Sequence, residues 1–356
     1  EIEGHGGLFN ASTSQEMTVL WTKMLQAHLP LALDVLADML RHSLLAADEV
    51  EKERRVILEE ISSSQDIPDE LVSLALHELT WPGHPLGWDV AGTPESVHGL
   101  ERDGLASFLL QNYGPANTVV SVAGDVQHQQ VVDMVADLLG DWQPAPAPGF
   151  AAAPVNGVGP RVSLINKKVE QSHLALHLPG LPRDHSERFV LGLLNVILGE
   201  GMSSRLFLEI RERLGLAYAV DSYVSTLADT GVTGVYAAVA PDRALEALAA
   251  ILDQLQRLRV EPVDEQALRS AKEFIKGRLL LGMEDTMAVA GWFGRQEAAG
   301  GEQLTVEQIV ERMERVSADD LLRVANQLFQ ASHGQLAVVG PHKRKEEARF
   351  KALLAG

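Results

Sequence analysis

The sequence predicts a layered α/β protein made of two similar halves, each with helices packed on a sheet. Strand and helix signals alternate along both halves of the 356-residue chain, which is typical of helices that cover a sheet. A chain of this length is too long for one ordinary hydrophobic core, so two domains are expected. Pattern alone leaves open whether the strands run parallel.

The first half is expected to begin with the end of a helix at glycine, followed by two strands. Residues 1–7, EIEGHGG, resemble the last turn of a helix that ends at glycine. Because residue 1 is not Met, we expect the chain to start inside an element, and the sequence does not indicate a compartment. A turn into a strand follows near Asn10 and Ala11, and this strand has the features of a sheet edge. A second strand is expected over 18–25.

The same order of elements is expected later in each half. Residues 93–124 and 305–340 both predict a capped short helix, a second helix, a turn and a buried strand that ends at glycine. A long helix precedes each block, over 47–63 and 263–281. Strands are also expected within 161–178. An internal duplication accounts for this order economically, although two unrelated α/β domains could imitate it.

A linker divides the two halves. Residues 143–160, QPAPAPGFAAAPVNGVGP, are rich in Pro, Ala and Gly and carry no charge, so they favour extended backbone over a helix or core strand. We therefore expect an N-terminal domain over 1–142 and a C-terminal domain over 161–356.

Composition narrows the function classes. With no cysteine, disulfides, thiolate metal sites and cysteine nucleophiles are excluded. The formal charge of −19 argues against a nucleic-acid partner. No apolar run approaches the length of a membrane span.

Two carboxylates stand out on the helix expected over 48–61. Projected at about 100° per residue, Glu53 and Glu60 fall within an apolar arc formed by Val50, Val56, Ile57 and Ile61. Buried carboxylates are costly unless they are paired, hydrogen-bonded or bound to a metal. The ordinary alternative, favoured by pattern alone, is that both side chains lie at the edge of the arc and reach solvent or a nearby Arg.

Two further groups of residues are candidates for chemistry. His173 and His177 have i, i+4 spacing, but strand signals flank them. On a strand they would lie roughly 13 Å apart, too far to share a zinc ion. Arg211, on the last turns of a helix, and Tyr218, in the next strand, could together bind a carbonyl oxygen or oxyanion. Alternatively, Arg211 serves the helix C-terminus and Tyr218 is an ordinary strand residue.

Together these segments resemble the pitrilysin/insulinase family of zinc metallopeptidases, and most closely the bacterial relatives of mitochondrial processing peptidase. The resemblance spans essentially the whole chain. It rests on the glycine-led segment 6–18, LALDVLADML at 31–40, VEKERRVILEEI at 50–61, GHPLG at 83–87, NTVVSVAGD at 117–125 and MSSRLFLEIRERLGLAY at 202–218. It implies two homologous domains, each with a mixed, largely antiparallel sheet and helices packed on one face.

The resemblance also implies a mechanism and residue roles. In this family an H-x-x-E-H helix supplies two zinc-ligand histidines and a glutamate base. The third Zn²⁺ ligand maps to Glu60, and its supporting carboxylate maps to Glu53. Arg211 and Tyr218 match the pair that holds the substrate and the developing oxyanion. Asn10 and Ala11 match the strand that binds the backbone of a peptide or unfolded protein.

One departure qualifies this assignment. The sequence contains no H-x-x-E-H, and in relatives that motif would fall upstream of Glu1. We therefore expect an intact zinc metalloendopeptidase, active as a homodimer or as a heterodimer with a related subunit, of which this chain alone has an incomplete zinc site and is inactive. The alternatives are a non-catalytic partner subunit of a heterodimeric peptidase and a non-hydrolytic peptide-binding homologue. Retention of Glu60 together with Arg211 and Tyr218 weighs against loss of the zinc site.

Overall fold

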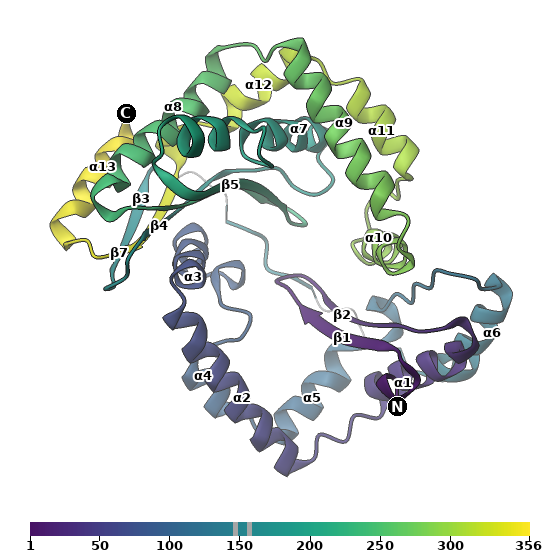
Figure 1. The fold of residues 1–356 in the computed structure, drawn as a ribbon. Coiled ribbons are helices and arrows are strands. Elements are labelled where there is room, and N and C mark those ends of the chain that lie inside the picture. Colours follow the sequence, from purple (N-terminus) through teal and green to yellow (C-terminus); the bar gives the residue numbers. More distant parts are fainter. Residues whose placement is uncertain (145–148, 155–158) are drawn as a thin grey trace. The chain divides into compact units, whose positions relative to one another are not determined.

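The computed structural model describes residues 1–144, 149–154 and 159–356 (Figure 1). Two stretches of the predicted linker, 145–148 and 155–158, lie outside the described residues. The chain forms two compact units. Unit 1 comprises residues 1–61, 90–150 and 281–303, and unit 2 comprises residues 62–89, 151–280 and 304–356. Each half of the chain therefore contributes a segment to the unit formed mainly by the other half. The predicted domain limits 1–142 and 161–356 stay a prediction.

Unit 2 is built on a five-stranded mixed sheet. Its strands are β3 (Arg161–Asn166), β4 (Ser172–Pro179), β5 (Ala217–Thr226), β6 (Gly231–Val239) and β7 (Gln335–Gly340). They lie in the order β3-β7-β4-β6-β5. Only β3 and β7 pair in parallel, and the other neighbours are antiparallel. The predicted mixed, largely antiparallel sheet is thus confirmed for this unit, as are the strands expected within 161–178.

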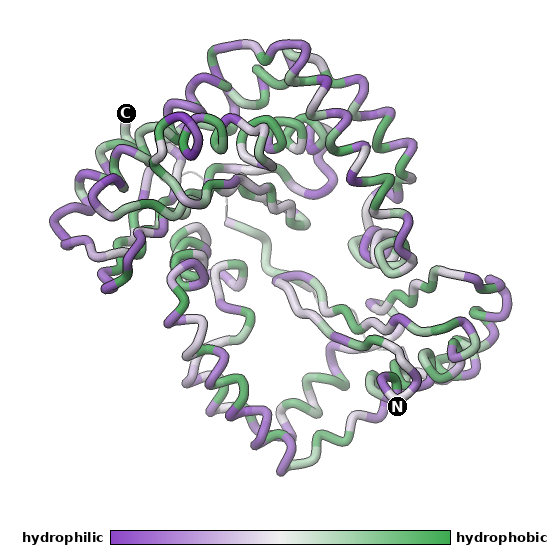
Figure 2. The backbone as a smooth tube through the Cα atoms, in the orientation of Figure 1, coloured by the Kyte–Doolittle hydropathy of each residue, from purple (hydrophilic) through white to green (hydrophobic). Residues whose placement is uncertain are grey.

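Helices cover one face of this sheet. α7 (Arg188–Leu198), α8 (Ala244–Val260) and α12 (Ala318–Leu328) contribute to the main hydrophobic core. Leu176, Val235 and Leu336 point into this core from alternate positions of their strands. α7 is hydrophobic along most of its length (Figure 2), because it is enclosed by the sheet and by other helices.

A helix from the first half covers part of the opposite face. α3 (Pro68–Thr80) places its buried Val72 and Leu76 against Ala175, Ala337 and Val339. These three sheet residues alternate with those that face the main core, so α3 and α7 lie on opposite sides of the strands. Because both faces are covered, β4 and β7 are buried almost throughout.

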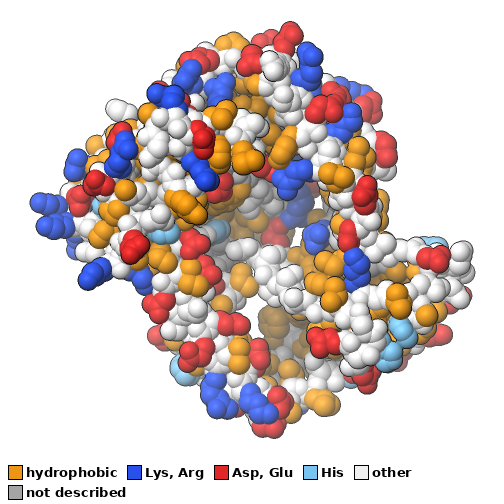
Figure 3. Space-filling model, viewed as in Figure 1, with side chains coloured by type: hydrophobic (Ala, Val, Ile, Leu, Met, Phe, Trp, Pro, Cys, Tyr) orange, Lys and Arg blue, Asp and Glu red, His pale blue; other side chains and the backbone are white. Residues whose placement is uncertain are grey.

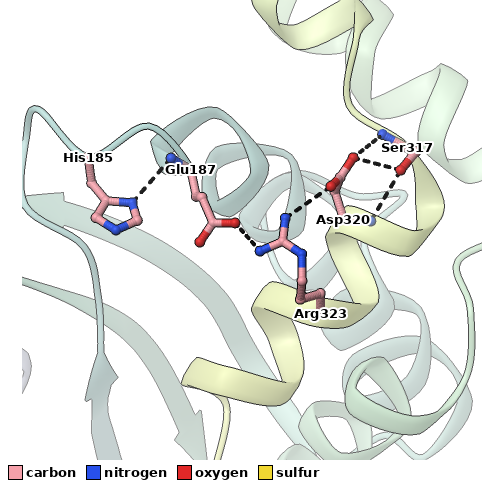
Figure 4. A network of polar contacts seen from close by, with 5 residues as sticks. All are labelled: His185, Glu187, Ser317, Asp320 and Arg323. Carbon is pink, nitrogen blue, oxygen red and sulfur yellow. Dashed lines mark hydrogen bonds and ion pairs between the residues drawn. The ribbon is translucent and has the colours of Figure 1, made fainter.

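A polar network joins the N-terminal ends of α7 and α12 (Figure 4). Glu187 pairs with Arg323, which also contacts Asp320 at 3.0 Å. Asp320 accepts a 2.6 Å hydrogen bond from the Ser317 hydroxyl, within the capping box that starts α12. The hydrogen bonds from Ser317 and Arg323 lower the pKa of Asp320 to about 2. His185 accepts a bond from the Glu187 backbone N–H, so both helix starts are fixed by side chains.

Unit 1 contains a hairpin and several helices. The hairpin pairs β1 (Leu8–Thr13) with β2 (Thr18–Lys23), which confirms both strands predicted there. The helices are α1 (Leu29–Arg41), α2 (Ala47–Asp66), α4 (Pro94–Gly99), α5 (Arg102–Asn112), α6 (His128–Leu139) and, from the second half, α10 (Thr286–Ala298). α2 confirms the helix predicted over 47–63 and continues past the end of unit 1 at Ile61. The remaining α-helices belong wholly or mainly to unit 2. They are α9 (Glu265–Gly282), α11 (Val306–Glu314) and α13 (Glu347–Ala355).

The elements recur in the same order in the two halves. In each half a glycine in the left-handed region stands two residues before a hairpin: Gly6 (φ 73°) precedes β1, and Gly215 (φ 58°) precedes β5. Capping boxes begin α4 at Thr93 and α11 at Thr305, as the repeated blocks predicted. This agreement supports an internal duplication.

One predicted strand is wrong. The segment ending at Gly124 forms no strand, and Val119 and Val120 are 38% and 43% exposed. Its counterpart β7 lies between β3 and β4 and bonds to both. Among the described residues, unit 1 has only the β1–β2 pair as strands. Without neighbouring strands the backbone of 117–123 has no ladder to join, whatever its side-chain pattern.

The surface charge and the hydropathy of the helices can be compared with the composition of the chain. Acidic and basic side chains are interspersed over the face seen in Figure 3, so the net charge of −19 gathers into no single patch in that view. Within the described ranges, no helix has both the length and the apolar content that a bilayer crossing requires.

Candidate functional site

The structure brings Arg211 and Tyr218 together in unit 2. Arg211 lies on the π-helix Phe207–Arg213, which is held to the core by the fully buried Ile210. The chain then turns at Gly215 and enters β5 at Ala217. The Arg211 Cζ atom lies 5.7 Å from the centroid of the Tyr218 ring. The predicted proximity of the two side chains is therefore confirmed, whereas their role stays a prediction.

A β-bulge sets the direction of Tyr218. Ala217 pairs with Val239 and Ala219 with the adjacent Ala238, so Tyr218 is the extra residue of the bulge. Bulges redirect side chains and recur beside active sites. Tyr218 is 74% exposed, although its neighbour Ala217 is buried. Its hydroxyl is thus available to an external acceptor.

Glu53 and Glu60 lie on α2 and are both exposed. The apolar arc predicted for this helix is partly wrong: Ile61 is buried, but Val56 is 48% exposed. Arg54 occupies the half-buried side instead and donates to the backbone carbonyl of Leu100 at 2.6 Å, near the end of α4. Glu53 and Glu60 therefore reach solvent, as the alternative interpretation predicted. Arg54 occupies the packed side of α2 because backbone carbonyls near the end of α4 accept its hydrogen bonds.

Asn10 and Ala11 lie side by side on β1, and both are exposed. The only described strand that pairs with β1 is β2, which agrees with the edge position predicted for it. The Ala11 backbone N–H donates to the Asn10 side-chain oxygen at 2.8 Å. A peptide that bonded to this N–H would replace the Asn10 oxygen.

The donor set does not fit a bound zinc ion. Of the ligands that the family resemblance implies, the printed sequence contains Glu60 alone. Among the described residues, no group of three His, Asp or Glu side chains lies close enough to hold a metal. A structural or catalytic zinc needs at least three protein ligands. The described residues therefore contain one of the ligands that the resemblance implies, and no catalytic step through the metal follows from them.

Sequence reasoning missed a buried polar network beneath α3. His177 on β4 is 1% exposed. Its Nδ1 atom lies 2.8 Å from the Thr80 hydroxyl and its Nε2 atom 2.8 Å from the Tyr223 hydroxyl. The single Thr80 hydroxyl proton is donated to the Leu76 carbonyl, so His177 Nδ1–H donates to Thr80 and Nε2 accepts from Tyr223.

Both titratable members of this network are neutral. Burial lowers the pKa of His177 well below its ordinary value of 6.5, with a smaller contribution from His77, and raises the pKa of Tyr223 to about 12. Both histidines of HLALH lie on one strand, as the flanking strand signals predicted. No local pattern indicates the role of Thr80, because Thr80 lies 97 residues from His177 and meets it only through tertiary packing.

We expect the free energy of unfolding to depend on His177 below about pH 6.5. The unfolded chain binds a proton as pH falls through this ordinary histidine pKa, whereas folded His177 does not, so stability is lost on acidification. The expected slope is about 1.4 kcal/mol per pH unit for this one proton. Urea unfolding curves at several pH values would measure it. His177→Gln should reduce the slope, and His333→Gln, at an exposed histidine of the same unit, should not; equal slopes in wild type and His177→Gln would contradict the prediction.

Comparisons with known proteins give the family. Residues 1–94 match the family model described as insulinase (peptidase family M16), and residues 99–275 match the model of the peptidase M16 inactive domain. A relative from Streptomyces coelicolor, described as an uncharacterized zinc protease, is 37% identical over 361 residues, covering 99% of this chain and 78% of the relative. The chain belongs to peptidase family M16. The resemblance to the pitrilysin/insulinase family is thereby confirmed.

Further relatives and solved structures agree. An uncharacterized zinc protease of Bacillus subtilis is 34% identical over 337 residues, covering 94% of this chain and 81% of the relative. A protease structure from Helicobacter pylori superposes with a TM-score of 0.87 at 24% identity, covering 95% of this chain and 83% of that one. A peptidase M16 inactive domain from Pseudomonas fluorescens gives a TM-score of 0.84 at 19% identity, with coverages of 96% and 83%. These structures confirm the layered M16-like fold.

Proposed function

We propose that this M16-family chain belongs to a zinc-dependent metalloendopeptidase of the pitrilysin/processing-peptidase type that hydrolyses unfolded peptides. The observation that carries the proposal is the match along 99% of the chain to a protein named as a zinc protease. In this proposal Glu60 is the third zinc ligand and Glu53 supports it. The chain alone, with one ligand of the set, is inactive.

The residues in unit 2 would act on the substrate carbonyl. Arg211 and Tyr218 can both donate hydrogen bonds, and charge that develops on a carbonyl oxygen is stabilised by donors already in place. Within the described part of the chain, neither side chain has a hydrogen bond or ion pair to another residue, and the two are in contact. Their donors are therefore available for a substrate.

The hairpin in unit 1 would bind the peptide backbone. β1 offers an edge at Asn10 and Ala11 to which an extended peptide can add as a further strand. Backbone pairing of this kind favours unfolded substrates, because a folded chain has already paired its own strands. We further propose that the working protein pairs with a related subunit, identical or different.

The test is the metal content of the protein purified with its natural N-terminus. We expect about one zinc per chain, cleavage of an unfolded peptide, loss of cleavage on chelation and recovery on adding zinc. Residues 1–356 alone, purified in parallel, should bind zinc weakly and cleave nothing. If the protein with its natural N-terminus holds no zinc and cleaves nothing, the peptidase proposal is wrong, and a non-catalytic partner subunit or a non-hydrolytic peptide-binding homologue replaces it.

A further inference from the structure

Phe207 is the first residue of the π-helix and stands four positions before Arg211. It is half-buried, next to the fully buried Leu206. The Arg211 Cζ atom lies 4.9 Å from the centroid of the Phe207 ring. Together with the 5.7 Å contact to Tyr218, this gives the Arg211 guanidinium two aromatic neighbours.

The contacts of Arg211 differ from those of its neighbour Arg213. Arg213 donates to Glu209 at 2.6 Å, so its donors are used within the helix. Arg211 has no hydrogen bond or ion pair to another residue in the described part of the chain. Aromatic rings rather than a carboxylate therefore hold Arg211. A guanidinium held by ring faces keeps the N–H groups at its edge free.

The backbone explains why Phe207 can reach Arg211. Leu214 donates to the Glu209 carbonyl five residues earlier, at 3.0 Å, which marks the π-helical hydrogen bond. Leu206 and Ile210 are both fully buried and anchor the segment to the core. Phe207 and Arg211 each follow one of these anchors by one residue, so both lie on the adjacent face of the helix.

We propose that Phe207 is a positioning residue that holds the Arg211 guanidinium beside Tyr218 with its N–H edge open to an acceptor. The positioning is a property of the described residues. Its consequence for substrate binding rests on the proposed function, in which Arg211 and Tyr218 bind the substrate carbonyl. A Phe207 that only filled space next to the core would leave the Arg211 side chain unaffected when replaced by another apolar residue.

The first experiment is solution NMR of the chain with isotope-labelled arginine. Rings on a guanidinium shift the side-chain proton signals upfield, so we expect Arg211 signals upfield of those of the exposed Arg344, with Arg211→Lys used for assignment. Phe207→Leu should return the Arg211 signals toward the Arg344 values, and Phe207→Tyr should preserve them. Leu208→Ala, at a 51% exposed neighbour, is the matched control and should leave them unchanged.

The outcomes separate this proposal from the proposed function. Arg211 signals that coincide with those of Arg344 in the wild type would overturn the positioning role, whether or not Phe207→Leu folds. Unchanged Arg211 signals in folded Phe207→Leu would overturn it as well. In the protein with its natural N-terminus, Phe207→Leu should lower peptide turnover and Phe207→Tyr should restore it. Normal turnover in Arg211→Lys would refute the role of Arg211 in catalysis and leave the NMR result standing.

Discussion

Glu60→Gln is expected to remove both tight zinc binding and peptide cleavage from the protein purified with its natural N-terminus. A neutral amide is a much weaker zinc ligand than a carboxylate. Loss of an outer partner of a zinc site typically costs 10- to 100-fold, so loss of a direct ligand should cost more than about 100-fold in metal affinity or activity. Metal analysis after dialysis and a peptide-cleavage assay would measure the two effects.

α2 provides matched controls for this substitution. Glu59→Gln changes the exposed carboxylate directly before Glu60, and this variant should retain zinc and activity. Glu53→Gln should give a smaller loss than Glu60→Gln, because Glu53 is proposed to support the site without binding the metal. In the folded chain Glu60 is exposed and has no hydrogen bond or ion pair to another described residue, so its replacement should leave stability unchanged. Zinc retained at wild-type affinity in Glu60→Gln would refute the ligand role.

Tyr218→Phe is expected to leave zinc binding intact and to lower kcat by roughly 100- to 1,000-fold, the effect of removing one oxyanion donor. The substitution deletes the hydroxyl and keeps the ring, so the contact with Arg211 should persist. Because Tyr218 is 74% exposed and its hydroxyl has no partner among the described residues, the melting temperature should not change. Steady-state kinetics together with zinc analysis would measure these effects.

The Tyr218 experiment has its own control. Tyr113→Phe removes a tyrosine hydroxyl in unit 1 and should leave kcat unchanged. Tyr223 is unsuitable as a control because its hydroxyl bonds to buried His177. Turnover at the wild-type rate in Tyr218→Phe would show that the hydroxyl does not stabilise the transition state, even if Arg211 contributes.

Much of the fold could be predicted from local signals. Helix starts at Thr93 and Thr305 were marked by capping residues, and both formed capping boxes. The glycine stop expected within residues 1–7 falls at Gly6, which adopts positive φ. These signals succeed because a cap or a left-handed glycine is satisfied by atoms a few residues away. The proximity of Arg211 and Tyr218 could be predicted from the sequence for the same reason, because one short turn joins the helix and the strand that carry them.

Other features depended on partners that are distant in sequence. The valines at 119 and 120 follow a strand pattern, yet they remain outside any sheet because a strand forms only beside another strand. Helical projection places Glu53 and Glu60 on an apolar arc, but Arg54 takes the packed side of α2 and donates to the Leu100 carbonyl just after α4. α3 of the first half covers the sheet of unit 2, and no periodicity in α3 specifies which sheet it contacts.

The sequence by itself determined the family, the order of the elements and the caps and turns that bound them, because these depend on local hydrogen bonding and on motifs read residue by residue. The tertiary structure alone decided which side chains are buried and which polar groups meet. The contact between Thr80 and His177, which lie 97 residues apart, is its product. The physical reason is that burial and electrostatic environment belong to the surfaces packed together, and those surfaces come from segments far apart in the chain.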